Sequence, residues 1–568
     1  MSDGNPTNLL YYGDNLDILR RYVKDESVDL IYLDPPFNSN QSYNVLFKER
    51  GGRMSDAQIH AFEDTWKWGL DAEHALKEIV ETGGAVSQTM QAFRTAIGTN
   101  DMLAYLTMMA PRLVELRRVL KPTGSIYLHC DPTASHYLRV LMDSIFRPER
   151  FINEIVWKRT SAHSDSQKYS SVTDFILFYS KTDVATWNPP YVAHDPKYLD
   201  TKYRFTDADG RRFRLSDMTS PHPRPNMMYD WKGHKSPRSG WRYSKETMAK
   251  LDAEGRIWYP DTKEKRPQLK RYLDKSAGRL PDNLWTDIPP VNSQARERLG
   301  YPTQKPEALV ERLIEASSNK GDLVLDPFGG CGTAVIAAQR LGRRWIGIDI
   351  THLAINLTKR RLRDTFGKDA QFQVIGEPVD VTGAKELAGK DPYQFQWWAL
   401  DLVDARPAEQ KKGSDKGIDG RIYFHDEADS SQTKQVIISV KAGHTNVAHV
   451  RDLRGVIERE KAAIGVLISV EEATQPMISE AASAGFYHSP GWNMDCPRIQ
   501  LRTIAELLAG KGLDVPPLQA TFKEAPKHVH NGNHQLEFTP ATSDADAVMV
   551  SDKSQKRKGR AKKGGPEV

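Results

Sequence analysis

Residues 30–37 read LIYLDPPF, an apolar run that ends in an acid, two prolines and an aromatic residue. The run is rich in β-formers and proline breaks a strand ladder, so the pattern predicts a buried strand that stops at Asp34. Because proline has no N–H group, Pro35 and Pro36 leave carbonyl acceptors beside the Asp34 carboxylate. Such a site suits an amino group, and Phe37 offers a ring for stacking on a base. An ordinary proline turn after a strand is the alternative.

The tetrapeptide Asp-Pro-Pro-Phe resembles the catalytic motif of the amino-directed DNA methyltransferases, which methylate N6 of adenine or N4 of cytosine. The resemblance implies that Asp34, Pro35, Pro36 and Phe37 are catalytic and hold the amine of a flipped base, without a metal. An acid at the first position is commoner in the adenine enzymes. The resemblance therefore favours N6-adenine, with N4-cytosine as the alternative.

A second motif surrounds residue 330. It consists of a predicted strand at 322–326, the loop PFGGCGT at 327–333, a helix at 334–341 and a strand at 344–349. Glycines let a backbone approach a ligand, a helix N-terminus presents N–H groups, and an acid that ends the second strand can bind ribose hydroxyls. The spacing from Asp326 to Asp349 is close to the roughly 20 residues of a nucleoside-binding βαβ unit.

This glycine loop lacks the Gly-x-Gly-x-x-Gly fingerprint of dinucleotide sites and is similar to the S-adenosylmethionine loop of the same methyltransferases. The Thr-Gln-Lys-Pro segment at 303–306 resembles the part that closes over the cofactor, and Gly13-Asp14 the part beside its adenine. A lone turn aspartate is more often a helix cap. The resemblance implies that the cofactor-binding residues are Asp14, Gln304, Lys305, Asp326, Phe328, Gly330, Gly332, Thr333 and Asp349.

The catalytic motif precedes the cofactor motif, which resembles the permuted β group of these enzymes. The expected fold is α/β, a permuted Rossmann-like S-adenosylmethionine-dependent methyltransferase assembled from 1–184 and 291–375, neither of which should fold alone. Between them lies a target-recognition insert at 185–290, where regular periodicity fades. Residues 191–290 hold 21 lysines and arginines against 14 acids, together with many aromatics. The composition favours DNA contact, and a solvated insertion with a small core of its own is the alternative.

Beyond a predicted linker at 376–390, residues 391–515 resemble a second α/β domain of the Mrr-type restriction-endonuclease-like fold. Asp419 and Lys441 match its metal site by position, but Ser439 replaces an acid, so Mg2+ would bind poorly. We expect a DNA-binding or regulatory remnant. The alternative is a bifunctional restriction-modification enzyme whose C-terminal nuclease uses Mg2+. The polar, basic tail at 521–568 is predicted to be a disordered DNA tether.

Composition limits the class of protein. Across 568 residues there are only three cysteines, far apart, so neither a disulfide scaffold nor a zinc site is expected. No stretch resembles a membrane span or a secretory leader, which predicts a cytoplasmic protein. Basic segments on a near-neutral body favour double-stranded DNA as the partner. A homodimer is left open, and the rival classes are a nicotinamide-dependent dehydrogenase and a catalytically idle DNA-binding protein.

Overall fold

The structure is a computed structural model that describes residues 8–36, 68–161, 169–292, 295, 297–299, 301, 303–408, 417–425 and 433–516. The predicted catalytic Phe37 and the predicted tail at 521–568 lie outside the described residues. None of the helices in the described part is both long and apolar enough to cross a membrane.

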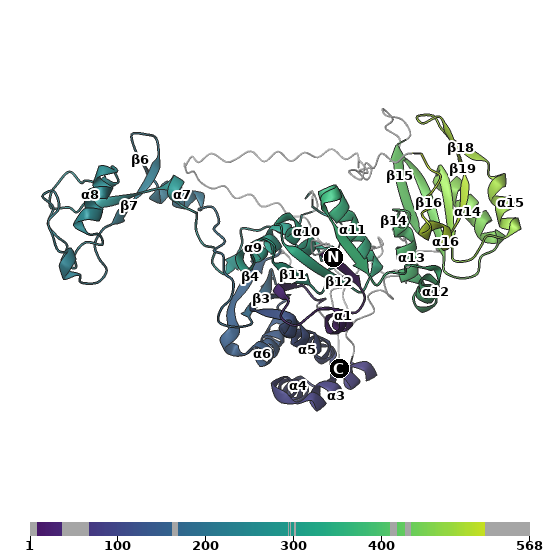
Figure 1. Cartoon of the computed structure of the whole chain (residues 1–568), viewed down its shortest axis with the longest axis horizontal. Coiled ribbons are helices and arrows are strands. Elements are labelled where there is room, and N and C mark those ends of the chain that lie inside the picture. Colours follow the sequence, from purple (N-terminus) through teal and green to yellow (C-terminus); the bar gives the residue numbers. More distant parts are fainter. Residues whose placement is uncertain are drawn as a thin grey trace, which may run out of the picture. The chain divides into compact units, whose positions relative to one another are not determined.

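A nine-stranded sheet with the order β10-β4-β5-β3-β2-β11-β12-β1-β13 forms the centre of the first body (Figure 1). Its strands are β1 (Asn8–Tyr12), β2 (Val28–Leu33), β3 (Leu120–Cys130), β4 (Phe151–Lys158), β5 (Thr173–Ser180), β10 (Leu284–Trp285), β11 (Leu323–Asp326), β12 (Arg344–Asp349) and β13 (Phe372–Ile375). Strand β5 runs antiparallel to its neighbours β3 and β4, and the other paired strands are parallel. Strands from both sides of the insert therefore build one sheet, as the permuted order predicts.

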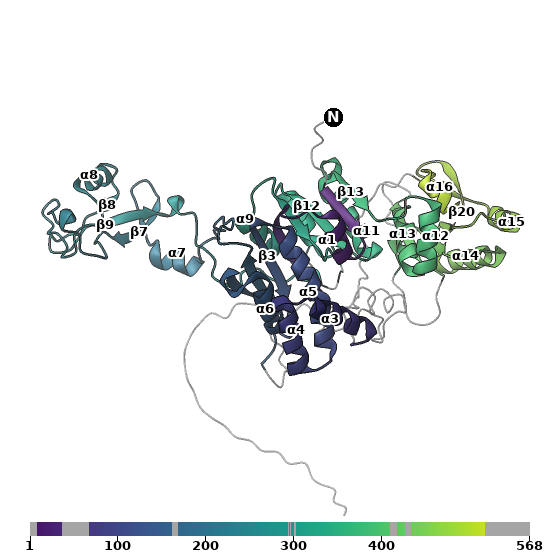
Figure 2. The same ribbon diagram turned by 60° about the horizontal axis from the view of Figure 1, so that its bottom comes forward.

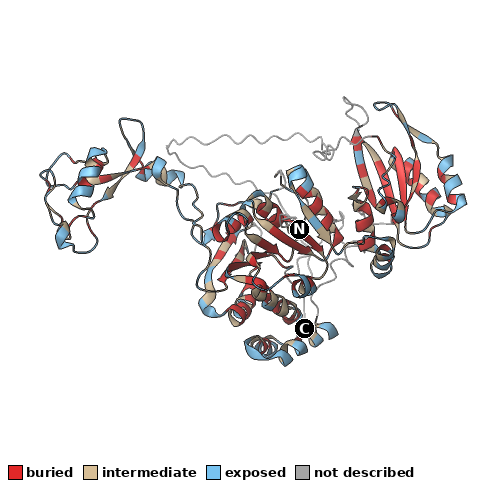
Figure 3. Cartoon of the chain, in the orientation of Figure 1, coloured by how far each residue is buried: buried red, intermediate tan, exposed pale blue. Residues whose placement is uncertain are grey.

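Helices cover both faces of this sheet (Figures 1 and 2). Leu30 and Tyr32 of β2 belong to one core, and Ile31 and Leu33 to the opposite one, which explains why the strand sequence is continuously apolar. Figure 3 shows the central strands as buried. The helices on the face of Leu30 and Tyr32 are α9 (Glu307–Ser317), α10 (Thr333–Arg340) and α11 (His352–Phe366). The helices on the face of Ile31 and Leu33 are α1 (Asn15–Tyr22), α5 (Asp101–Val119) and α6 (Ser135–Phe146), with α3 (Leu70–Thr82) and α4 (Gly84–Ile97) packed against them.

The insert is a folded unit, so the predicted fading of regular structure is wrong. Its four-stranded sheet has the order β6-β7-β9-β8. The elements are α7 (Pro196–Lys202), β6 (Phe205–Thr206), β7 (Arg212–Asp217), α8 (Lys245–Ala253), β8 (Ile257–Trp258) and β9 (Gln268–Tyr272). A small core contains the fully buried Trp241, with Met248 of α8 and Leu269 of β9. Several aromatics that suggested base stacking are therefore core residues; the insert has a core of its own, and its contact with DNA stays a prediction.

The second body is built on a five-stranded sheet with the order β14-β15-β16-β17-β20. Its elements are α12 (Val381–Lys390), α13 (Pro392–Asp401), β14 (Arg406–Pro407), β15 (Gly420–His425), β16 (Thr433–Lys441), α14 (Val447–Glu460), β17 (Ile464–Ser469), α15 (Gln475–Ser483), β18 (Phe486–Ser489), β19 (Met494–Pro497), β20 (Ile499–Thr503) and α16 (Ile504–Leu508). The predicted linker at 376–390 is mostly helix α12. Only Ala384 and Ala388 of that helix are buried, so its apolar periodicity is too weak to recognise in the sequence.

Candidate active site

The two sequence motifs leave the nine-stranded sheet side by side. Strands β2 and β11 are parallel neighbours, with Leu30 opposite Val324 and Ile31 opposite Leu325. Paired strands lie about 4.8 Å apart, and the carboxyl ends of parallel strands meet at one edge of a sheet. Asp34 and the glycine loop at 327–333 therefore share one edge, which a combined acceptor and cofactor site requires.

Asp34 has one occupied and one open carboxylate oxygen. Lys305, immediately before α9, donates to Asp34 Oδ2 at 2.5 Å, and both side chains are largely buried. Among the described residues, Asp34 Oδ1 is buried and has no hydrogen-bond donor. A buried acceptor without a donor costs free energy, so the open oxygen points to a ligand that brings an N–H or O–H group. Pro35 beside it is buried and Pro36 is exposed.

A buried polar chain supports the strand that carries Asp34. Tyr32 Oη lies 3.1 Å from His129 Nδ1, and His129 Nε2 lies 3.2 Å from Asp174 Oδ2. Burial opposes ionisation of Asp174, but the hydrogen bond to His129 and the positive charges of Lys305 and Arg159 outweigh it, so the pKa of Asp174 is lowered. These hydrogen bonds fix the side chain of Tyr32, two residues before Asp34, and they place the Asp174 carboxylate near Lys305.

The glycine loop is shaped by its neighbours as well as by any ligand. Gly332 has a left-handed φ of +76°, and a Cβ there would lie 2.6 Å from Thr358 Oγ1 of α11. Helix packing alone therefore requires this glycine. The Gly330 N–H group donates to Asp349 Oδ2 at 2.8 Å, and Thr351 donates to Oδ1 from its backbone and its hydroxyl.

Three carboxyl groups converge on this edge of the sheet. Burial raises the pKa of Asp326 to about 8, and the negative charges of Asp34 and Asp349 add to the effect, although the Phe328 N–H group opposes it. Burial likewise raises the pKa of Asp349. Carboxylates held together in a buried site favour a positively charged ligand, because a nearby cation stabilises their ionised forms.

The predicted residue Asp14 caps α1 and has a partner in α5. Its side chain accepts the Leu16 N–H group, and Arg112 donates to Asp14 Oδ2 at 2.6 Å. Arg112 also holds Asn15, whose amide donates to the Pro327 carbonyl at 2.8 Å. Asp14 is thus a helix cap, its predicted contact with the cofactor stays a prediction, and Asn15 links its turn to the glycine loop. Arg112 lies 97 residues along the chain from Asn15 and gives no local sequence signal.

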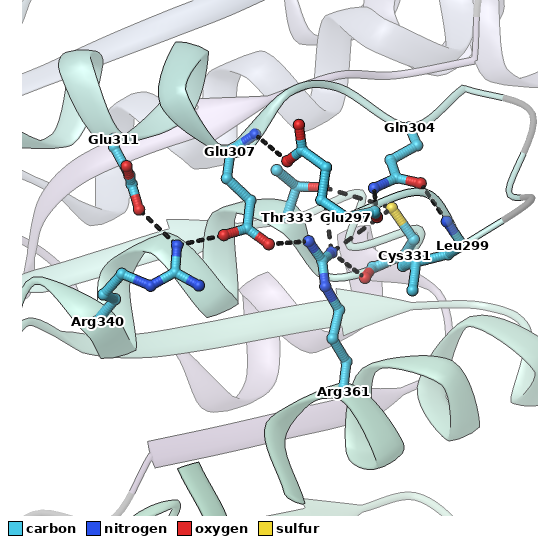
Figure 4. A network of polar contacts seen from close by, with 9 residues as sticks. All are labelled: Glu297, Leu299, Gln304, Glu307, Glu311, Cys331, Thr333, Arg340 and Arg361. Atoms are coloured by element: carbon cyan, nitrogen blue, oxygen red, sulfur yellow. Dashed lines mark hydrogen bonds and ion pairs between the residues drawn. The ribbon is translucent and has the colours of Figure 1, made fainter. Parts of the chain in front are cut away.

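The segment before α9 is held by a polar network that sequence analysis missed (Figure 4). Gln304 spans its own turn, since its amide contacts the Glu297 carbonyl at 2.5 Å and the Leu299 N–H group at 2.8 Å. The predicted contact of Gln304 with the cofactor stays a prediction. Arg361 of α11 donates to the Cys331 carbonyl in the glycine loop at 2.8 Å and to Glu307 at 2.5 Å.

Tyr301 is a further residue of this edge that sequence analysis missed. A Cβ placed on Gly330 would lie 3.5 Å from the Tyr301 ring. Burial, with the Asp349 and Asp34 carboxylates nearby, raises the pKa of Tyr301 well above its ordinary value. Its position two residues before the Thr-Gln-Lys-Pro segment was the available signal. The ring offers an apolar wall beside the glycine loop.

In the second body, Asp419 of the predicted metal site is hydrogen-bonded to the neighbouring strand β16. Asp419 is buried, and its Oδ2 accepts the Val440 N–H group at 2.6 Å and the Ser439 hydroxyl at 3.2 Å. Lys441 follows at the end of β16. Within the described ranges there is no group of three or more His, Cys, Asp or Glu side chains that could hold a metal ion. The Asp419 carboxylate thus stabilises the neighbouring strand.

Comparison with known families separates the two bodies. The DNA methylase family matches residues 28–360, and the family of NACHT-associated inactive Restriction Endonuclease 1 matches residues 393–509. The second match coincides with the sheet that carries Asp419.

Named relatives resemble the first body. The Type II methyltransferase M.EcaI of Enterobacter cloacae is 31% identical over 361 residues, which cover 63% of this chain and 69% of that protein. The Type III restriction-modification enzyme StyLTI Mod subunit of Salmonella typhimurium is 26% identical over 390 residues, covering 66% of this chain and 56% of that protein. The DNA adenine methyltransferase YhdJ of Escherichia coli is 25% identical over 360 residues, which cover 63% of this chain and 84% of that protein. Among solved structures, the DNA modification methylase TTHA0409 of Thermus thermophilus, complexed with S-adenosyl-L-methionine, is 17% identical, with a TM-score of 0.30 and coverage of 65% and 100%.

Proposed function

Because this chain belongs to the DNA methylase family, we propose that it transfers a methyl group from S-adenosylmethionine to N6 of adenine in double-stranded DNA. The single observation that supports methyl transfer to an exocyclic amino group is the open, buried Asp34 Oδ1 at the edge shared with the glycine loop. The relative YhdJ, named as an adenine methyltransferase, also favours adenine over N4 of cytosine.

The chemistry follows from the acceptors near Asp34. An exocyclic amine that donates one N–H to Asp34 Oδ1 and the other to the Pro35 carbonyl keeps its nitrogen lone pair free for attack. The nitrogen gains a bond to the methyl carbon as that carbon's bond to sulfur breaks, and it gives up the proton that it shares with Asp34 Oδ1. Lys305 holds the other carboxylate oxygen at 2.5 Å, so the open oxygen keeps a fixed direction. Positioning and polarisation of the amine then provide the catalysis.

The residues of the cofactor edge fit S-adenosylmethionine. When bound, it supplies a methyl group attached to a positively charged sulfur. The carboxyl groups of Asp34, Asp326 and Asp349 favour a cation, and the Tyr301 ring and the glycine loop provide an apolar wall and a close backbone surface. Asp349 has Gly330 and Thr351 as donors and keeps acceptor capacity for a ribose hydroxyl.

Cofactor binding should release about one proton at pH 7. In the free protein, Asp326 with a pKa of about 8 is mostly protonated at this pH. A cationic ligand favours the ionised carboxylate, so binding lowers this pKa and the affinity increases as the pH rises toward 8. Calorimetric titration with S-adenosylmethionine in buffers of different ionisation enthalpy measures the proton count. The variant Asp326→Asn should release none, and equal proton release by both proteins would contradict the assignment.

The direct test of the function is transfer of labelled methyl groups from S-adenosylmethionine to unmodified bacterial DNA, followed by base analysis and sequencing with detection of modified bases. We expect N6-methyladenine within one short sequence context. Labelled methyl groups on N4 of cytosine would instead support the alternative, an N4-cytosine methyltransferase. Absence of any transfer would sink the proposal, and binding of NADH in an optical titration would then favour the dehydrogenase class.

We expect no DNA cleavage by the second body. Its Asp419 carboxylate accepts two hydrogen bonds from β16, and Ser439 supplies no anionic ligand. Supercoiled plasmid, methylated or not, should stay intact with Mg2+ or Mn2+. Nicking by the wild-type protein that disappears in Lys441→Ala would instead support the bifunctional alternative.

A further inference from the structure

The insert carries a strongly basic cavity on its small sheet. The cavity has a volume of about 620 Å³ and is lined by Tyr203, Arg211, Arg214, Glu254, Arg256, Arg271, Tyr272, Lys275 and Ser276. Five of these nine side chains are cationic and one is anionic. The positive charge therefore exceeds what the cavity's own residues neutralise.

Two of the arginines face each other directly. Arg214 of β7 and Arg271 of β9 are register partners in an antiparallel pair, which places their side chains next to each other on one face of the sheet. The same face carries Leu269 and Ile257 of the insert's core farther along the strands. Like charges in directly opposed positions destabilise a sheet. The pair therefore does not stabilise the fold of the insert, which indicates a role in binding.

Protein carboxylates do not neutralise this pair. Arg211 is bound to Asp209 at 2.6 Å, and Arg256 lies 3.5 Å from Glu254. Neither Arg214 nor Arg271 has a carboxylate within ion-pair distance among the described residues, and Arg214 Nε is buried without a hydrogen-bond acceptor there. The Arg214 guanidinium lies 5.9 Å from the centre of the Tyr203 ring, which gives the cavity an aromatic wall.

We propose that this cavity binds a backbone phosphate of DNA between Arg214 and Arg271 and thereby fixes the position of the duplex without reading its sequence. The inference deepens, and rests on, the proposed action on DNA. A phosphodiester accepts forked hydrogen bonds from several guanidinium groups, and its charge removes the repulsion between the paired arginines. A guanine edge takes one bidentate arginine, so a converging group of cations fits a phosphate better than a base.

The test compares the double variant Arg214→Gln/Arg271→Gln with the control Lys235→Gln/Arg238→Gln. The control removes the same charge from exposed positions of the insert outside the cavity. Binding is measured over a range of salt concentrations, on a duplex that contains the methylated sequence and on a scrambled duplex. We expect the cavity variant to bind both duplexes at least about 10- to 100-fold more weakly, because the loss of even one hydrogen bond to a charged group reduces affinity by that order.

The salt dependence and the sequence preference decide the assignment. The slope of log K against log salt should become shallower by up to about 1.8 in the cavity variant and change less in the control, while the ratio of the two affinities stays at the wild-type value. Cofactor binding should match the wild type, and the melting temperature should be equal to or higher than that of the wild type, since the substitutions remove repulsion. A changed affinity ratio would show base reading and overturn the proposal, as would equal losses in both variants. Wild-type protein that binds no duplex would overturn the action on DNA as well, whereas undiminished binding by the cavity variant of an active enzyme overturns this inference alone.

Discussion

The variant Asp34→Asn should lower kcat for methyl transfer about 100- to 1,000-fold, the usual cost of removing one preorganised hydrogen-bonding group from a reacting centre. Lys305 donates to Oδ2 at 2.5 Å, so an amide at position 34 will turn its oxygen toward that ammonium group. Its NH2 group then occupies the place of Oδ1. The substrate amine meets a donor where it needs an acceptor, and its lone pair is no longer directed by the enzyme.

Single-turnover rates with saturating cofactor and DNA isolate this step from binding. Calorimetry should show that cofactor affinity falls much less than kcat, because one of the three carboxyl groups that favour the cation is lost while the glycine loop, Tyr301 and Asp349 remain in place. The matched control is Asp17→Asn, the same change at a half-exposed carboxylate of α1 that is paired with Arg21. The control should retain the wild-type rate. If Asp34→Asn kept more than a tenth of the wild-type rate, Asp34 would have no catalytic role in methyl transfer.

Local sequence patterns were sufficient to predict the central elements of the fold. The run at 30–33 is apolar on both faces because helices cover both sides of β2, and such a run is typical of a buried parallel strand. The βαβ unit of β11, α10 and β12 was predictable for the same reason, since its glycines and its final acid Asp349 lie within one short stretch.

Contacts between distant segments could not be read from the sequence. Lys305 and Asp34 are 271 residues apart, and the ion pair between them became visible only when β11 was placed beside β2. Lys305 appeared in the sequence as a cofactor residue by resemblance, and the structure places its ammonium group on the Asp34 carboxylate. Asp174 and Tyr301 likewise depend on the tertiary arrangement.

The insert was misjudged because its elements are short. Strands β6 and β8 each have two residues, too few for a period-2 pattern to emerge. Its tryptophans and tyrosines were considered for base contact, yet Trp241 is completely buried. In a small domain, a few large side chains must supply most of the core, so aromatic content alone does not indicate a nucleic-acid surface.

The largest expected loss of stability follows from Arg361→Met. Arg361 is 6% exposed and joins Glu307 of α9 to the Cys331 carbonyl of the glycine loop. Removing one partner of a buried ion pair costs up to about 3–5 kcal/mol when the other charge is left unpaired, and we expect the lower end of this range because Arg340 still binds Glu307. In calorimetric melting, the unfolding of the nine-stranded sheet is the transition whose midpoint temperature rises when S-adenosylmethionine is added. The loss of stability should appear in that transition. Cofactor affinity should fall too, since the loop carbonyl loses its donor.

The variant Arg340→Met provides the control, because Arg340 binds the same Glu307 carboxylate from a side chain that is 41% exposed. Exposed pairs contribute about 0–1 kcal/mol, so this change should be mild. Burial opposes ionisation of Glu307, but Arg340 and Arg361 outweigh it and lower the pKa of Glu307 below its ordinary 4.5. The stabilisation is therefore present above pH 4.5 and is lost as the pH falls through the lowered pKa. The difference between wild type and Arg361→Met should shrink in acid, and a difference independent of pH would show that Arg361 acts through packing and the Cys331 carbonyl alone.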